Sequence, residues 1–281
     1  STEYSFDSCG IHPVQLIVTD DNGCIDSVTQ DVEVYCEPTA DFEYIPECVG
    51  TNTIFTSTSY SDTSISIYIW DMGGLGNYQV DGSGNMTGPN SENPVFLYDT
   101  CGIYNVTLTV TDGNLCDSVI TIPVTVWCNP TAAFSAPPQC LDYQPIIFND
   151  ITTWGGGNPD TWTWTMNTDG NGTGSYEPGM NNTLPSTEYS FDSCGIHPVQ
   201  ILIIDDNGCR DSTIQNVEVY CEPTADFDYI PECVGTNTIF TSTSSSDTTI
   251  TSWLWNMGGP GTWIGTSANS ENPVFVYNTC G

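Results

Sequence analysis

The same fifteen residues, STEYSFDSCGIHPVQ, begin at Ser1 and again at Ser186. Related cysteine-containing phrases, CEPTADFEYIPEC, CNPTAAFSAPPQC and CEPTADFDYIPEC, begin at Cys36, Cys128 and Cys221, which are 92 and 93 residues apart. The sequence is therefore a repeat of about 92 residues in which two slightly different versions alternate. Internal repetition on this scale restricts the chain to an array of small, similar structural units.

The spacing of the phrases predicts four parts: the C-terminal part of a unit at 1–35, complete units at 36–127 and 128–220, and the N-terminal part of a unit at 221–281. We expect the chain to be a stretch of a longer repetitive protein. Each complete unit holds four cysteines, and the partial units hold two and three, which explains the odd total of thirteen.

Each unit has the pattern of an all-β domain. Residues 104–110, YNVTLTV, alternate strictly between apolar and polar, as expected of a strand with one buried face. The turn that follows reads DDNG in the sister units, and Asn-Gly is a strong hairpin signal. About seven short strands in a unit without helical periodicity predict a β-sandwich of the immunoglobulin type.

At this point the units resemble the PKD (polycystic kidney disease) domain across the whole chain. In the first complete unit, the matching residues are Pro38, Ala40, Phe42, Cys48, Gly50, Phe55, Ser59, Trp70, Asp71, Gly73, Asn93, Pro94, Tyr98, Gly102, Tyr104, Val106, Leu108, Val110 and Asp112. The resemblance implies tandem immunoglobulin-like sandwiches stacked end to end. Cysteine-rich arrays of this type are similar to those of giant secreted surface proteins and adhesins of Bacteroidota-type bacteria.

Charge and cysteine content restrict the possible functions. The chain has 35 Asp and Glu against one basic residue, Arg210, so it should repel nucleic acid and anionic lipid. No apolar run is long enough to span a membrane. Thirteen cysteines without a C-x-x-C pair indicate disulfides formed outside the cell rather than a zinc or redox site.

Four cysteines in a unit allow three pairings, and an immunoglobulin-type topology helps to choose among them. It places the first and last cysteines of a unit at one pole and the middle two at the opposite pole, and a disulfide cannot span the length of a sandwich. We therefore predict the bonds Cys36–Cys116, Cys48–Cys101, Cys128–Cys209, Cys140–Cys194 and Cys233–Cys280. Short junctions such as VTVWCNPTAAF predict restricted bending between units.

Candidate chemical sites are few. His12 and His197 occupy the repeat position that Tyr104 fills in the sister unit, which favours a packing role. No nucleophile–histidine–acid set can be assembled, and we expect no enzymatic activity and no required cofactor. Calcium is a minor alternative to a solvated hairpin turn; its candidate ligands are Asp20, Asp21, Asp26, Asp205, Asp206 and Asp211.

Two further kinds of surface site are predicted. Trp154 and Trp263 are expected in loops, where they would contact a neighbouring chain or a glycan. Short Asp-Ser/Thr triplets resemble the O-glycosylation signal of Bacteroidota and imply sugars on Ser27, Ser118, Ser212 or Thr248.

These features lead to two functional hypotheses. The first is a structural segment of a long secreted filament, stalk or adhesin, whose partners are further copies of the repeat in the same or neighbouring chains, with surface glycans as a second class of partner. The alternative is a carbohydrate-binding or spacer module of an extracellular hydrolase. Neither involves nucleic acid or insertion into a membrane.

Overall fold

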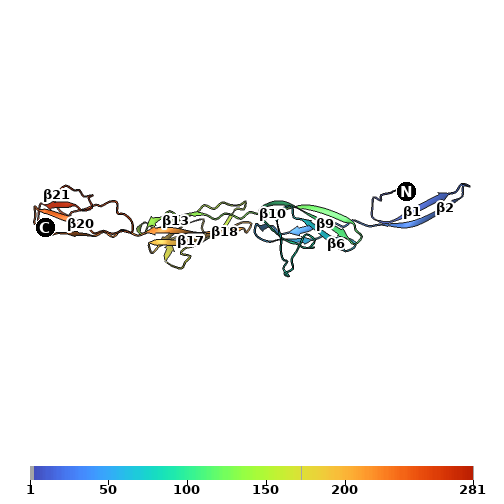
Figure 1. Cartoon of the computed structure of the whole chain (residues 1–281), viewed down its shortest axis with the longest axis horizontal. Helices are drawn as coiled ribbons and strands as arrows, with labels where there is room; N and C mark the ends of the chain where they lie inside the picture. Colours follow the sequence, from blue (N-terminus) through green and yellow to red (C-terminus); the bar gives the residue numbers. More distant parts are fainter. Residues whose placement is uncertain (1–2, 172, 281) are drawn as a thin grey trace. The chain divides into compact units, whose positions relative to one another are not determined.

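The computed structural model describes residues 3–171 and 173–280. In this part of the chain the regular structure is strand, apart from one short 3-10 helix, η1 (Leu141–Tyr143). The expected all-β class is therefore confirmed, and so is the immunoglobulin-like architecture of paired sheets (Figure 1). Among the described residues, no helix is long and apolar enough to cross a bilayer.

The strands fall into two lists along the chain. The first contains β1 (Gly10–Thr19), β2 (Ile25–Val34), β3 (Phe42–Tyr44), β4 (Glu47–Cys48), β5 (Thr53–Ser57), β6 (Ile65–Asp71), β7 (Gly76–Tyr78), β8 (Val95–Tyr98), β9 (Gly102–Asp112) and β10 (Asp117–Trp127). The second contains β11 (Phe134–Ser135), β12 (Gln139–Cys140), β13 (Ile146–Asp150), β14 (Pro159–Thr165), β15 (Gly174–Tyr176), β16 (Ser186–Phe191), β17 (Gly195–Asp205), β18 (Arg210–Tyr220), β19 (Phe227–Tyr229), β20 (Asn237–Ser242), β21 (Gly261–Trp263) and β22 (Val274–Tyr277).

Residues 36–127 form a complete sandwich. Its two sheets have the strand orders β4-β10-β9-β6 and β3-β5-β8-β7. Strand β9 alternates as the sequence predicts, with Val106, Leu108 and Val110 fully buried. These side chains belong to the same core as the ring of Trp70, whose centroid lies 5.0 Å from that of Phe42. The long hairpin β9–β10 therefore supplies much of the core of the sandwich.

Residues 128–220 repeat this arrangement with the sheets β11-β13-β16-β15 and β12-β18-β17-β14. Trp164 takes the place of the first tryptophan and packs 5.3 Å from Phe134 and 5.7 Å from Phe148 between ring centroids. From the hairpin β17–β18, the side chains of Val199 and Ile201 are fully buried. Both complete repeats thus bury the same positions of the same hairpin.

The two outer parts of the chain have fewer strands. Hairpin β1–β2 is a two-stranded sheet of its own, and residues 221–281 form a single sheet of order β19-β20-β22-β21. Figure 1 shows β1 and β2 side by side with no second sheet against them.

By its internal contacts the chain divides into two compact units. The first comprises Ser1–Thr131, Thr153–Asp160 and Ile203–Asp211, and the second comprises Ala132–Thr152, Thr161–Leu202 and Ser212–Gly281. The first compact unit therefore includes the tip of the hairpin β17–β18. The division by sequence repeat into 1–35, 36–127, 128–220 and 221–281 stays a prediction.

Candidate functional site: the disulfide-bonded repeat positions

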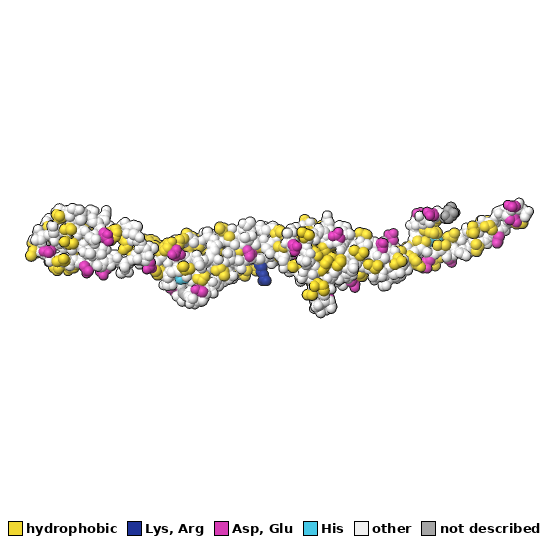
Figure 2. Space-filling model, in the orientation of Figure 1, with side chains coloured by type: hydrophobic (Ala, Val, Ile, Leu, Met, Phe, Trp, Pro, Cys, Tyr) yellow, Lys and Arg dark blue, Asp and Glu magenta, His cyan; other side chains and the backbone are white. Residues whose placement is uncertain are grey.

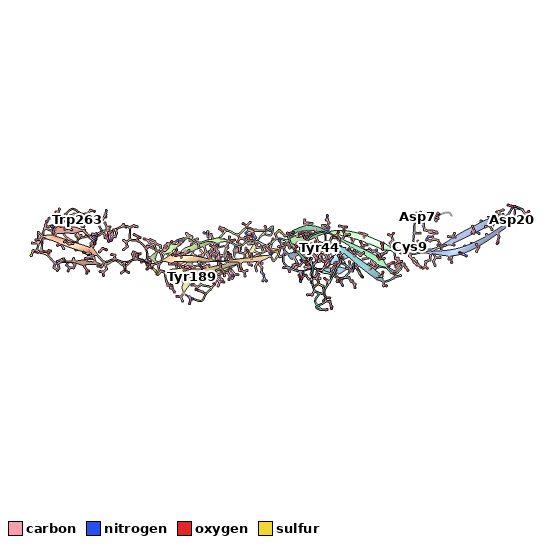
Figure 3. All side chains as sticks on the ribbon, in the orientation of Figure 1. Asp7, Cys9, Asp20, Tyr44, Tyr189 and Trp263 are labelled. Atoms are coloured by element: carbon pink, nitrogen blue, oxygen red, sulfur yellow. A yellow bond between two sulfur atoms is a disulfide. The ribbon has the colours of Figure 1, made fainter. Side chains whose placement is uncertain are left out.

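Three disulfides occupy the same repeat position. They join Cys9 to Cys36, Cys101 to Cys128 and Cys194 to Cys221, each with a sequence separation of 27 residues and a Cα–Cα distance of 4.9 Å. Each bond closes the base of a long hairpin. The strand register explains it: Gly102 lies opposite Val126, so the cysteines that flank these strands emerge at the same end. Figure 3 shows Cys9 near the base of hairpin β1–β2 and Asp20 at its tip.

A fourth disulfide, Cys48–Cys209, joins two different repeats. Its sequence separation is 161 residues and its Cα–Cα distance is 5.6 Å. Cys48 ends strand β4, which pairs in parallel with the end of β10 and lies opposite Trp127. Cys209 lies in the turn of hairpin β17–β18 and is 1% exposed. Both cysteines belong to the first compact unit.

Hydrogen bonds fix the backbone on both sides of this bond. On the Cys48 side, the N–H of Val49 donates to the carbonyl of Trp127, and the side-chain amide of Asn129 donates to the carbonyl of Val49. On the Cys209 side, the carboxylate of Asp205 accepts the N–H of Cys209 at 2.8 Å. The disulfide is therefore held between two ordered segments rather than between mobile loops.

The five predicted disulfides are wrong in their partners. Cys36–Cys116 and Cys128–Cys209 do not form, because Cys36 and Cys128 directly follow the last strand of a hairpin and meet the cysteine at its base. Cys48–Cys101 and Cys140–Cys194 do not form because Cys101 and Cys194 belong to such hairpin-base bonds. Cys233 and Cys280 are both free, since residues 221–281 contain no counterpart of Cys128 or Cys209.

Five described cysteines are free: Cys24, Cys116, Cys140, Cys233 and Cys280. Each occupies a repeat position that is bonded elsewhere in the chain. Cys24 and Cys116 correspond to Cys209, Cys140 and Cys233 correspond to Cys48, and Cys280 corresponds to Cys101. Burial raises the pKa of the Cys116 thiol, and the charge of Asp112 adds to the effect, so this thiol is protonated at neutral pH.

An aspartate organises the tip of each long hairpin. One carboxylate oxygen of Asp112 accepts the N–H groups of Asn114 and Cys116, at 2.9 and 3.0 Å, and the other accepts the hydroxyl of Ser61. Burial opposes ionisation of Asp112, but these hydrogen bonds outweigh it and leave its pKa below the ordinary value. At Asp20, the N–H of Cys24 is the main cause of the lowered pKa.

The calcium candidates have local partners in these turns. Asp20 and Asp205 each accept two backbone N–H groups within the turn, Asp26 accepts the N–H of Ser27, and Asp206 accepts from Asn158. Asp21 lies exposed at the tip of the first hairpin, and Asp211 lies next to Arg210 in β18. In the described ranges no three His, Cys, Asp or Glu side chains are grouped as they would be around a metal ion. The structure gives these aspartates a role in turn formation.

The histidine and tryptophan candidates lie at packing positions. His197 is 4% exposed, stacks on Phe191 and shares hydrogen bonds with Asn167 and the carbonyl of Ser193. Trp263 lies in strand β21 rather than in a loop, and its ring meets Phe275 edge to face at 4.9 Å. Trp154 is half-buried in the segment between β13 and β14.

The four glycosylation candidates differ in accessibility. Ser27, Ser212 and Thr248 are exposed. Ser118 is half-buried, and its hydroxyl accepts the N–H of Ala40 at 3.4 Å. Glycosylation of these residues stays a prediction, and Ser118 is the least accessible position.

Comparison with known proteins finds no matching family model and no matching curated protein. Solved structures do match. The PKD1 domain of Vibrio anguillarum Epp is 26% identical and aligns over 33% of this chain and 96% of its own, with a TM-score of 0.27. The fibronectin(III)-like modules of Clostridium thermocellum CbhA are 14% identical over 66% of this chain and 94% of their own, with a TM-score of 0.29. The bacterial integrin-binding protein invasin is 14% identical over 97% of this chain and 60% of its own, with a TM-score of 0.34.

Proposed function

We propose that this chain is a load-bearing segment of an extracellular filament, stalk or adhesin built from tandem immunoglobulin-like sandwiches. The observation that carries the proposal is the disulfide Cys48–Cys209, which joins one repeat covalently to the hairpin tip of the next. A pull along the chain reaches this bond before it reaches the hydrogen bonds of the intervening sheets. A bond in this position is of use to a protein that transmits tension.

The same bond can recur in a longer array. Cys116 lies at the hairpin tip of its repeat as Cys209 does, and Cys140 ends strand β12 as Cys48 ends β4. Strand β12 also pairs in parallel with the end of β18, which places Cys140 opposite Tyr220. Further copies of the repeat would therefore find a bonding partner on either side.

Composition and chemistry support a location outside the cell. Four disulfides persist in an oxidising environment and are rare in the cytosol. The net charge of −34 keeps parallel chains apart by repulsion, except where cations screen it. Acidic side chains lie along the visible face of the molecule (Figure 2).

Immunogold electron microscopy of cells that produce the protein tests the proposal. We expect antibodies against this chain to decorate thread-like appendages along their length. Labelling that is confined to a secreted hydrolase would instead favour the accessory-module hypothesis. In that case a Trp154→Ala variant should also lose affinity for an insoluble polysaccharide, whereas the filament proposal predicts no such loss.

A further inference from the structure

Residues 221–281 have an uncovered apolar face. Phe227 is 49% exposed, whereas its repeat counterpart Phe42 is 3% exposed. Trp255 is half-buried, whereas its counterpart Trp70 is 3% exposed. A groove of about 570 Å³ follows this face; its apolar lining includes Phe227, Phe240, Ile250, Trp255, Met257 and Tyr277.

The backbone along this groove also lacks a partner strand. In the complete repeat, β6 pairs with β9, and Trp70 lies opposite Leu108. The counterpart of β6 is the segment 250–256, and it has no strand structure. Both the side chains and the backbone on this face therefore lack the hairpin that covers them in residues 36–127.

Hairpin β1–β2 has the complementary defect. Val14, Leu16 and Val18 are 43%, 61% and 53% exposed. Their counterparts in β9, which are Val106, Leu108 and Val110, are all fully buried. Figure 2 shows hydrophobic side chains along the part of the surface that this hairpin forms.

We propose that hairpin β1–β2 of a second copy of this chain docks onto the open face of residues 221–281 and completes a sandwich. Both parts have counterparts that are found packed together within this chain. Residues 1–35 nearly repeat 186–220, whose hairpin β17–β18 lies in the sandwich of 128–220. Residues 221–281 resemble 36–101, which pack against β9–β10. The proposal deepens the proposed function, on which it rests, by giving the filament a non-covalent, head-to-tail way to lengthen.

Docking requires one local rearrangement. Phe6 stacks on His12 at 4.5 Å between ring centroids, and its repeat counterpart in the acceptor is Tyr277. In the complete repeats the corresponding stacked pairs are Tyr98 with Tyr104 and Phe191 with His197. Tyr277 of the acceptor copy would therefore replace Phe6 on the imidazole of His12, and the segment around Phe6 would move aside.

Two neighbouring residues provide a matched pair of variants. Leu16 and Ile17 are about equally exposed in the free chain, at 61% and 58%, so aspartate at either position should affect the folding of the single chain similarly. Only Leu16 belongs to the face that docking buries; the counterpart of Ile17 is Thr109, on the outer face of the sheet. An unpaired charge at Leu16 would have to be buried in the completed core.

Sedimentation velocity of the full, oxidised chain over a wide range of concentration tests the proposal. We expect oligomers that grow with concentration and with salt, since each copy carries a charge of −34. Leu16→Asp should weaken association by about a hundredfold or more, and Ile17→Asp should change it little. A wild-type chain that stays monomeric, or two variants that weaken association equally, would overturn the proposal.

A mixing experiment identifies the acceptor. Phe227→Asp should disable the open face and leave the hairpin intact, whereas Leu16→Asp should do the reverse. Each variant alone should stay monomeric, and an equimolar mixture should form a dimer and nothing larger. A mixture that stays monomeric would contradict the assignment of the two surfaces. Such a failure would leave the load-bearing role intact, because that role depends on Cys48–Cys209 and is tested separately by microscopy of cells.

Discussion

Pulling the chain by its two ends should reveal how its disulfides shorten the load path. When all four bonds are intact, tension passes across Cys9–Cys36 and Cys48–Cys209 and bypasses the residues between them. The separations of these two bonds are 27 and 161 residues, so together they remove 188 residues from the path. Since an extended chain gains about 3.3–3.6 Å per residue, reduction should lengthen the fully stretched molecule by about 650 Å.

A variant that lacks only the inter-repeat bond gives a second, smaller length. In Cys48→Ser with Cys209→Ser, tension passes through 53 residues to Cys101, crosses to Cys128, and continues through 66 residues to Cys194. The intact path already uses the 12 residues from Cys209 to Cys221, so the net gain is 107 residues, or about 370 Å.

Optical tweezers with peptide-tag handles can measure both lengths, first in oxidising buffer and then with reductant. The oxidised wild-type chain should stop extending at the short contour length whatever force is applied below rupture. If the oxidised molecule extends to the full length of its 281 residues, the inter-repeat disulfide does not carry load and the proposed mechanism fails.

Three further predictions concern stability. Replacing Cys101 and Cys128 together by serine should lower the free energy of unfolding by about 3.5 kcal/mol, as chain-entropy models give for a 27-residue loop, whereas Cys116→Ser should change it little; chemical denaturation compares the two. Asp112→Ala should cost about 2 kcal/mol because it removes the acceptor of two turn N–H groups and a hydroxyl, and Asp112→Asn, which keeps one acceptor, should cost less in the same assay; equal losses would contradict the turn role. Burial raises the pKa of Tyr176 to about 12, so its stabilisation should be complete below about pH 10 and should fall as the pH rises toward 12; a melting temperature that stays constant over this alkaline range would refute it.

Much of the fold follows from local patterns in the sequence. Strict alternation predicts the buried face of β9 because a sheet with one covered side needs apolar residues at every second position. The same reasoning places Trp70 inside and Ile69 outside, and the structure agrees, with 3% and 50% exposure. Trp263 differs: the Gly/Asn-rich context points to a loop, but the residue lies in β21 and packs on Phe275.

The disulfide pairing required information beyond the single unit. The poles to which the sequence assigns the cysteines depend on treating each repeat as a closed domain, and that assumption excludes bonds between repeats. The hairpin-base bonds could have been found by counting outward from the predicted turn, because equal steps from Asp112 and Cys116 lead to Cys101 and one residue short of Cys128. The Cys48–Cys209 bond depends on tertiary packing across 161 residues, for which a single sequence contains no direct signal.

Overlapping disulfides also protect the chain against a broken backbone. Hydrolysis of any single peptide bond between Cys48 and Cys209 leaves the two fragments joined by sulfur. The lone trypsin site, Arg210, lies just beyond that interval but within the loop closed by Cys194–Cys221, so cleavage there would not sever the molecule either. A protein exposed to proteases can thus be nicked across most of its length and remain one covalent object.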